Sequence, residues 1–182
     1  MKKQFITLLL IFPFLISGQS IFEKFQNNKN VTSISITPKM FQMLGSMAIS
    51  SDDPESRSLK EIINGIKSFN ALITGSSDII TQMTKWVEIT SEKEHFNKIF
   101  SISEEKIEMN IYAKHGQDDD GLKTILIFSK GFSNNQNNSK KNAKKVEAFL
   151  LIVEGDVSIE NVSKLIGKMN LPGSNQLKKA GI

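Results

Sequence analysis

Cysteine is absent from this 182-residue chain. Its absence excludes disulfides, thiol catalysis, zinc–thiolate sites and iron–sulfur clusters. Only two histidines occur, and no Gly-x-Ser-x-Gly segment marks a nucleophile elbow. We therefore expect a protein that is not an enzyme and has no cofactor. The 19 acidic residues leave one catalytic alternative open, a hydrolase whose two carboxylates are distant in the chain.

The chain also lacks an apolar run long enough to cross a bilayer as a helix, which takes about 20 residues. Its longest run, residues 5–16, follows Met-Lys-Lys and precedes the small residues Ser17, Gly18 and Ser20. This order of a basic start, an apolar stretch and small residues is typical of a secretory signal peptide. We predict a signal peptide over residues 1–20, cleaved after Gly18 or after Ser20.

Export predicts a periplasmic or extracellular protein. No cysteine at the junction offers a site for a lipid, so we expect no stable membrane anchor in the mature chain. Removing Lys2 and Lys3 with the signal lowers the net charge from +4 to +2. Nucleic-acid binders usually carry a concentrated basic face. The expected partner is therefore not a nucleic acid but an unknown envelope protein or polymer.

Residues 21–182 are predicted to form one α+β domain. The hydrophobic periodicity changes from the 3.6-residue period of helices to the two-residue period of strands after about Asn97. Strands are expected at 31–36, 69–74, 99–103, 106–114, 122–130 and 146–154, and helices after Pro38, Ser58, Ser77 and Ser158. This order predicts a largely antiparallel sheet with helices packed mainly on one face.

Two strands carry opposite patterns. In 106–114, Met109 and Ile111 alternate with Asn110 and Tyr112, as in a sheet with one wet face. Residues 149–153 are continuously apolar, which indicates a central strand covered on both sides.

Residues 133–145 are rich in asparagine and lysine and are predicted to form a mobile loop between two strands. Lys140, Lys141, Lys144 and Lys145 form the one basic cluster of the chain. They can contact an anionic surface such as lipid head groups, lipopolysaccharide or a cell-wall polymer. A solvated loop kept soluble by its charge is the favoured interpretation.

A weak metal-site candidate combines His115 with Asp118 and Asp120. Gly116 and Gly121 flank the acids, however, and Asp-Gly is typical of a hairpin turn. The alternating oxygen ligands and distal glutamate of an EF-hand are absent. We favour the turn and predict no metal site.

Other polar candidates have simpler structural interpretations. Near a helix end, His95 can pair with the carboxylate of Glu92 or Glu94 and act as a general base, but surface charge explains these three residues better. The Thr74–Ser77 segment stands between a strand and a helix, where anions can bind. It lacks the lysine and the second glycine of a phosphate loop, so helix capping is favoured.

Apolar candidates are also assigned to structure. Met40, Met43 and Met47 recur at helical spacing and can form an adaptable binding surface. Helical methionines beside phenylalanine and leucine usually belong to the core. We therefore assign them to the core, together with Trp86.

Several segments of the chain form a recognisable pattern: 22–47, within which the strand 31–36 leads into Lys39-Met40-Phe41, then Tyr112-Ala-Lys114, Phe149–Asp156 and Ser163-Lys-Leu165. In content and order these segments resemble the family called domain of unknown function 4252. The resemblance implies an exported protein of a Gram-negative bacterium, often a lipoprotein, with no established activity. This chain departs from the pattern in lacking a lipid-bearing cysteine and in having a longer Asn-rich insertion at 134–138. No catalytic residue is implied.

The leading hypothesis is a non-catalytic binding or assembly module of the cell envelope. One alternative is a carrier of a small apolar ligand or lipid, which requires a cavity between sheet and helices. The other is the dispersed-carboxylate hydrolase, which requires a concave cluster of acids with shifted pKa values.

Overall fold

The computed structural model describes residues 20–49, 60, 63, 65–104, 106–116, 121–132 and 146–181. The predicted helix start at Ser58 and the predicted loop at 133–145 lie outside these ranges. The described elements are α1 (Ile21–Phe25), β1 (Val31–Ile36), α2 (Pro38–Ile49), β2 (Ile66–Thr74), α4 (Ser77–Lys93), β3 (Asn97–Glu104), β4 (Ile107–His115), β5 (Leu122–Lys130), β6 (Ala148–Val157), α5 (Ile159–Lys168) and α6 (Ser174–Lys179).

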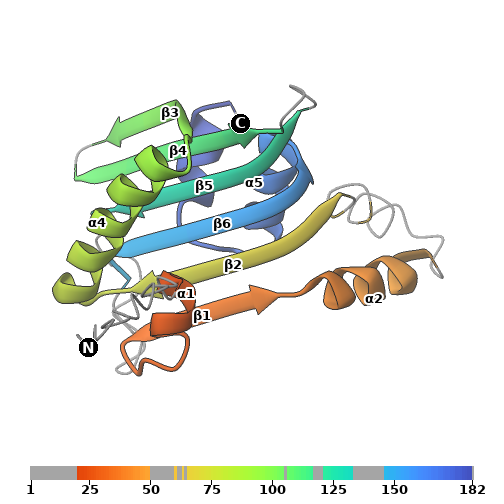
Figure 1. The fold of residues 1–182 in the computed structure, drawn as a ribbon, viewed down its shortest axis with the longest axis horizontal. Coiled ribbons are helices and arrows are strands. Elements are labelled where there is room, and N and C mark those ends of the chain that lie inside the picture. Colours follow the sequence, from red (N-terminus) through yellow and green to blue (C-terminus); the bar gives the residue numbers. More distant parts are fainter. Residues whose placement is uncertain are drawn as a thin grey trace, which may run out of the picture.

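The six strands form one sheet in the order β1-β2-β6-β5-β4-β3 (Figure 1). Every neighbouring pair is antiparallel. Strands β3 to β6 follow one another as neighbours, whereas the connection from β2 to β3 crosses to the far edge of the sheet through α4. The prediction of an α+β fold with a largely antiparallel sheet is confirmed.

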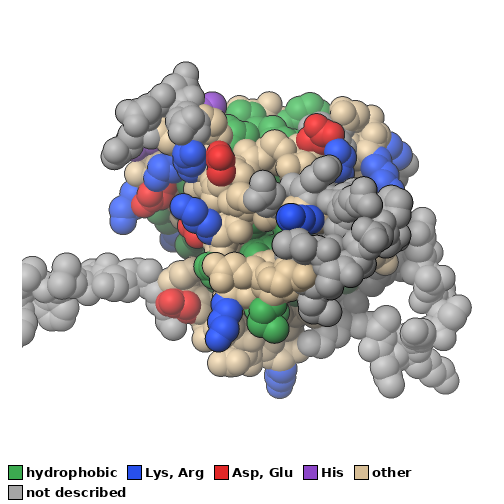
Figure 2. Space-filling view, turned by 90° about the vertical axis from the view of Figure 1, so that its right-hand side faces the viewer, with side chains coloured by type: hydrophobic (Ala, Val, Ile, Leu, Met, Phe, Trp, Pro, Cys, Tyr) green, Lys and Arg blue, Asp and Glu red, His purple; other side chains and the backbone are tan. Residues whose placement is uncertain are grey.

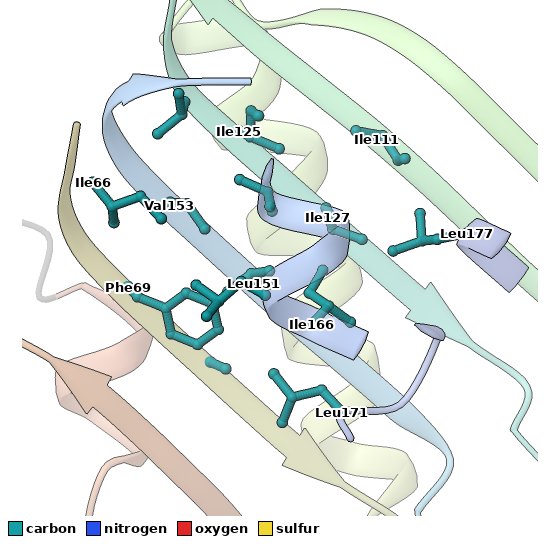
Figure 3. Packing of buried hydrophobic residues seen from close by; sticks show 14 of the residues in the cluster. Ile66, Phe69, Ile111, Ile125, Ile127, Leu151, Val153, Ile166, Leu171 and Leu177 are labelled. Carbon is teal, nitrogen blue, oxygen red and sulfur yellow. The ribbon is translucent and has the colours of Figure 1, made fainter. Parts of the chain in front are cut away.

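One face of the sheet is covered by α5 and α6. Val162, Leu165 and Ile166 of α5 and Leu177 of α6 are buried against β2, β4, β5 and β6. Figure 3 shows Ile166, Leu171 and Leu177 above the strand residues of this cluster. Because Ser158 accepts a hydrogen bond from the Asn161 N–H, α5 is capped where the sequence predicts its start.

The opposite face is partly covered by α1 and α4. Ile79, Met83 and Val87 of α4 and Ile21 and Phe25 of α1 are buried against the sheet in a second apolar cluster. The expectation that the helices lie mainly on one face is therefore corrected. Helices lie on both faces because β2, β5 and β6 carry apolar side chains on both sides, as predicted for β6 from residues 149–153.

Some predictions of side-chain burial were wrong. Tyr112 was expected on a wet face, but it is only 9 % exposed and belongs to the cluster under α4. Met40 and Met43 were expected in the core, but they are 47 % and 57 % exposed. Their helix α2 lies beyond the end of β1 (Figure 1), and of its described side chains Phe41 alone is buried.

Helix α1 begins directly after the predicted signal peptide. Ser20 is its N-cap: the hydroxyl accepts from the Phe22 N–H at 3.4 Å, and the carbonyl accepts from the Lys24 N–H at 3.0 Å. Ile21, the next residue, is 3 % exposed. A chain that began at Ile21 would lose both acceptors and would place a charged ammonium at the positive end of the helix dipole.

The backbone just before β2 passes close to β6 at Gly155. The Asp156 N–H donates to the Gly65 carbonyl at 2.8 Å. A Cβ atom on Gly155, whose φ is +139°, would lie 2.0 Å from that carbonyl oxygen. Only glycine fits this position.

We predict that Gly155→Ala lowers the free energy of unfolding by roughly 2–3 kcal/mol, because the added methyl group collides with backbone at a strained φ. Gly167→Ala is the matched control. Gly167 lies inside α5 with no atom within 4 Å of the new Cβ, so this change should stabilise by about 0.5–1 kcal/mol. Urea unfolding of both variants tests the pair, and a Gly155→Ala protein as stable as the parent would contradict the close approach.

Candidate functional site

A cleft of about 390 Å³ opens on the face of the sheet that α1 and α4 cover only in part. Its walls come from both helices and its floor from β1, β2 and β6. The lining residues are Ser20, Phe22, Glu23, Gln26, Ser33, Ser35, Asn70, Trp86, Ile152 and Glu154. The cleft is thus a mixed surface of aromatic, hydroxyl, amide and carboxylate groups.

The floor arises from a change of polarity along each strand. Side chains two residues apart point to the same face, and on this face they turn from apolar to polar with distance from α4. From the covered end to the open end they are Val31, Ser33 and Ser35 in β1, Leu72, Asn70 and Ser68 in β2, and Leu150, Ile152 and Glu154 in β6. The polar residues lie where no helix of the described chain covers the sheet (Figure 1).

Hydrogen bonds between strands hold the polar floor in place. The Ser35 hydroxyl donates to Asn70 Oδ1 at 2.7 Å, and the Ser68 hydroxyl donates to Glu154 Oε2 at 2.7 Å. Each bond joins neighbouring strands, so these side chains have little freedom to move apart. The floor is therefore arranged before any ligand arrives.

Two aromatic rings form the wall between α1 and α4. Phe22 of α1 meets Trp86 of α4 edge to face, with ring centroids 5.9 Å apart and an interplanar angle of 88°. This is a favourable aromatic geometry. Trp86, assigned to the core from the sequence, is instead half-buried at the cleft.

The charge of the cleft is negative. Glu23 and Glu154 line it, and none of the lining residues that the structure describes is Lys, Arg or His. Elsewhere, many lysines lie beside acids, as Lys123 does at 3.4 Å from Asp156. Figure 2, which views the molecule from the right-hand side of Figure 1, shows basic and acidic side chains interspersed over the described part of that face.

Of the weak metal candidates, the structure describes His115 alone. His115 ends β4 on an exposed position, and the Gly116 N–H donates to the Gly121 carbonyl, which closes a hairpin there. Asp118 and Asp120 lie outside the described ranges. Within those ranges, no three His, Cys, Asp or Glu residues gather closely enough to hold a metal ion.

The basic candidates Lys140, Lys141, Lys144 and Lys145 also lie outside the described residues, so their contact with an anionic surface stays a prediction. Thr74 has a structural role: its hydroxyl donates to the Asn30 carbonyl at 2.8 Å and accepts from the Ser76 N–H at 3.1 Å.

The carboxylate of Glu94, a candidate partner of the base His95, is paired with a lysine. It lies 3.1 Å from Lys114 Nζ, and this hydrogen bond and the lysine charge lower the pKa of Glu94. His95 follows in an exposed, left-handed conformation with φ of 57°. The pair therefore does not resemble a general base with its orienting acid.

Sequence reasoning missed Ser33, Ser35, Asn70 and Glu154 as site residues. A signal was present, because the two-residue period of a strand places Val31, Ser33 and Ser35 on one face. Recognising the cleft also requires the knowledge that β2 lies between β1 and β6, and that all three strands turn from apolar to polar toward the same end.

Comparison with known families agrees with the resemblance seen in the sequence. The family model described as Domain of unknown function (DUF4252) matches residues 24–165. The chain belongs to this family. The matched part of this DUF4252 chain includes β1, β2, β6 and α4, and so most of the cleft. Comparison with curated proteins and with solved structures found no match.

None of the helices in the described ranges combines the length and the apolar character needed to cross a membrane.

We predict that Lys114→Met raises the pKa of Glu94 toward its ordinary value, because the hydrogen bond and the positive charge are both removed. NMR titration of the carboxyl carbons measures it. Glu160, whose pKa is lowered by Lys164 on the other side of the sheet, is the internal control and should not change.

The lowered pKa of Glu94 also adds to the free energy of unfolding. This contribution is present above the unfolded-state pKa and is lost as the pH falls through the folded-state pKa. An unchanged Glu94 titration in the variant would contradict the assignment.

Proposed function

We propose that this protein is a non-catalytic, exported binding module of the cell envelope, and that it holds its partner in the cleft between α1 and α4. The observation that carries the proposal is the cleft itself. It combines a half-buried tryptophan with convergent hydrogen-bonding groups on a rigid sheet. Concave sites with an aromatic wall and a few placed polar groups are the usual form of a binding site.

The arrangement of acids supports a non-catalytic role over the hydrolase alternative. A hydrolase of this kind needs carboxylates in a shared concave site with raised or split pKa values. Among the described residues the resolved shifts, at Glu94 and Glu160, are both downward and come from lysine partners on the surface. The two cleft carboxylates, Glu23 and Glu154, are exposed.

The packing favours the binding module over a carrier of an apolar ligand. The apolar side chains between the sheet and its helices fill the two clusters, with Phe69, Phe149 and Leu150 at 0 % exposure. The cleft, in turn, is open and rich in polar groups. Enclosing an acyl chain there would leave hydrogen-bonding groups without partners.

Site-specific photocrosslinking in intact cells tests the proposal. A photoreactive amino acid at Gln26, an exposed residue of the cleft, should give adducts larger than the monomer. The same group at Asn175, exposed on α6 across the sheet, is the control and should not. When cells are fractionated by osmotic shock, the protein should appear in the released periplasmic fraction or the medium. Its N-terminus should be shortened by removal of the signal peptide.

Two results would contradict the proposal. Equal labelling from Gln26 and Asn175, or from neither, would remove the cleft as the contact surface. An uncleaved chain recovered with the cytoplasm would remove the envelope as its location.

A further inference from the structure

We propose that the cleft binds an uncharged saccharide chain, with one sugar ring stacked on Trp86. The inference rests on the proposed function, because it names the ligand of the same cleft. It is argued from the two aromatic rings, the hydroxyl and amide groups of the floor, and the sign of the charge.

The aromatic wall suits the apolar face of a sugar ring. A pyranose presents a patch of C–H groups on one face, and these groups carry the partial positive charge that an aromatic face attracts. Trp86 is half-buried, and its ring is held by the edge-to-face contact with Phe22 at 5.9 Å. A ring fixed before binding loses little conformational entropy when the ligand arrives.

The floor offers groups that match sugar hydroxyls. Ser33, Ser35, Asn70 and Gln26 each carry both donor and acceptor capacity. Sugar hydroxyls also donate and accept, so either partner can adjust to the other. The Ser35–Asn70 hydrogen bond fixes two of these groups at the spacing of adjacent strands.

The charge distribution excludes anionic ligands. Glu23 and Glu154 line the cleft, and among the described residues no lysine, arginine or histidine does. A phosphate, sulfate or uronate would meet two carboxylates with no cation to balance them. Each carboxylate can instead accept hydrogen bonds from sugar hydroxyls, which are stronger than bonds between neutral groups.

A cationic ligand is the competing class, because aromatic faces and carboxylates together also attract ammonium groups. Glu154, however, already accepts a hydrogen bond from the Ser68 hydroxyl at 2.7 Å. The other polar side chains of the cleft, Ser20, Gln26, Ser33, Ser35 and Asn70, carry no charge. The uncharged hydroxyl and amide groups then outnumber the charged groups available to a ligand. These features favour the saccharide.

A glycan array followed by fluorescence titration tests the inference with the mature chain. Trp86 is the single tryptophan of the protein, so its emission reports directly on the cleft. We expect saturable emission changes with uncharged oligosaccharides selected on the array. Sulfated and sialylated counterparts should bind at least tenfold more weakly.

Three variants separate the cleft from the rest of the molecule. Trp86→Ala should weaken binding at least tenfold, measured by calorimetry. Ser35→Tyr, at an exposed position away from the core, should block the cleft without disturbing the fold, which circular dichroism checks. Ile89→Ala, at a residue of α4 that is 51 % exposed and outside the cleft, is the matched control and should bind as the parent does.

The inference is overturned if no uncharged glycan binds, if anionic glycans bind equally well, or if the Ser35→Tyr protein binds as the parent does. Spermidine and tetramethylammonium are included as cationic probes, and a response to these alone would reassign the ligand. If the saccharide inference fails but Gln26 still crosslinks to a partner in cells, the proposed function stands. If Gln26 gives no crosslink either, the proposed function fails as well.

Discussion

The structure depends on how far one helix can cover one face of the sheet. The chain must travel from β2 to β3, which lie four strand positions apart, and it does so through α4. A helix of 17 residues is about 25 Å long, and four steps of about 4.8 Å need about 19 Å. The helix therefore crosses the sheet once.

Helix α4 is only about 10 Å wide, whereas strands of nine or ten residues are about 30 Å long. Most of each strand's length on this face must be covered by something else or be polar.

The sequence meets this constraint in two ways. The short helix α1 covers the part of β1 and β2 beside α4, where Ile21 and Phe25 are buried. Beyond it, Ser35, Asn70 and Glu154 make the same face polar, and the cleft forms where the covered and the polar parts meet. On the other face, α5 and α6 bury an apolar set that runs from β2 to β4. The asymmetry between the faces thus follows from the path of the chain.

Much of the fold could be predicted from residue patterns. The alternation in β4, the continuous apolar run in β6 and the Thr37-Pro38 helix start all correspond to observed elements. The helices on both faces were missed, because Tyr112 looks like a residue of a wet face until α4 is known to cover that side of β4. The cleft was missed for a related reason. Ser33, Asn70 and Glu154 are ordinary strand residues in the sequence, and only the strand order brings them together. Met40 and Met43 follow a core pattern, yet their helix lies beyond the sheet, which local periodicity does not report.

The central claim is that the α4 face is open beside Trp86. Acrylamide quenching of the single tryptophan in the folded, ligand-free protein measures this directly. The account predicts a Stern–Volmer slope between that of the unfolded chain and that of a buried indole, and a steeper slope after Phe22→Ala, since Phe22 covers one side of the ring. A slope near zero in the parent protein would mean that the ring is sealed in the core, and the cleft would not exist in solution.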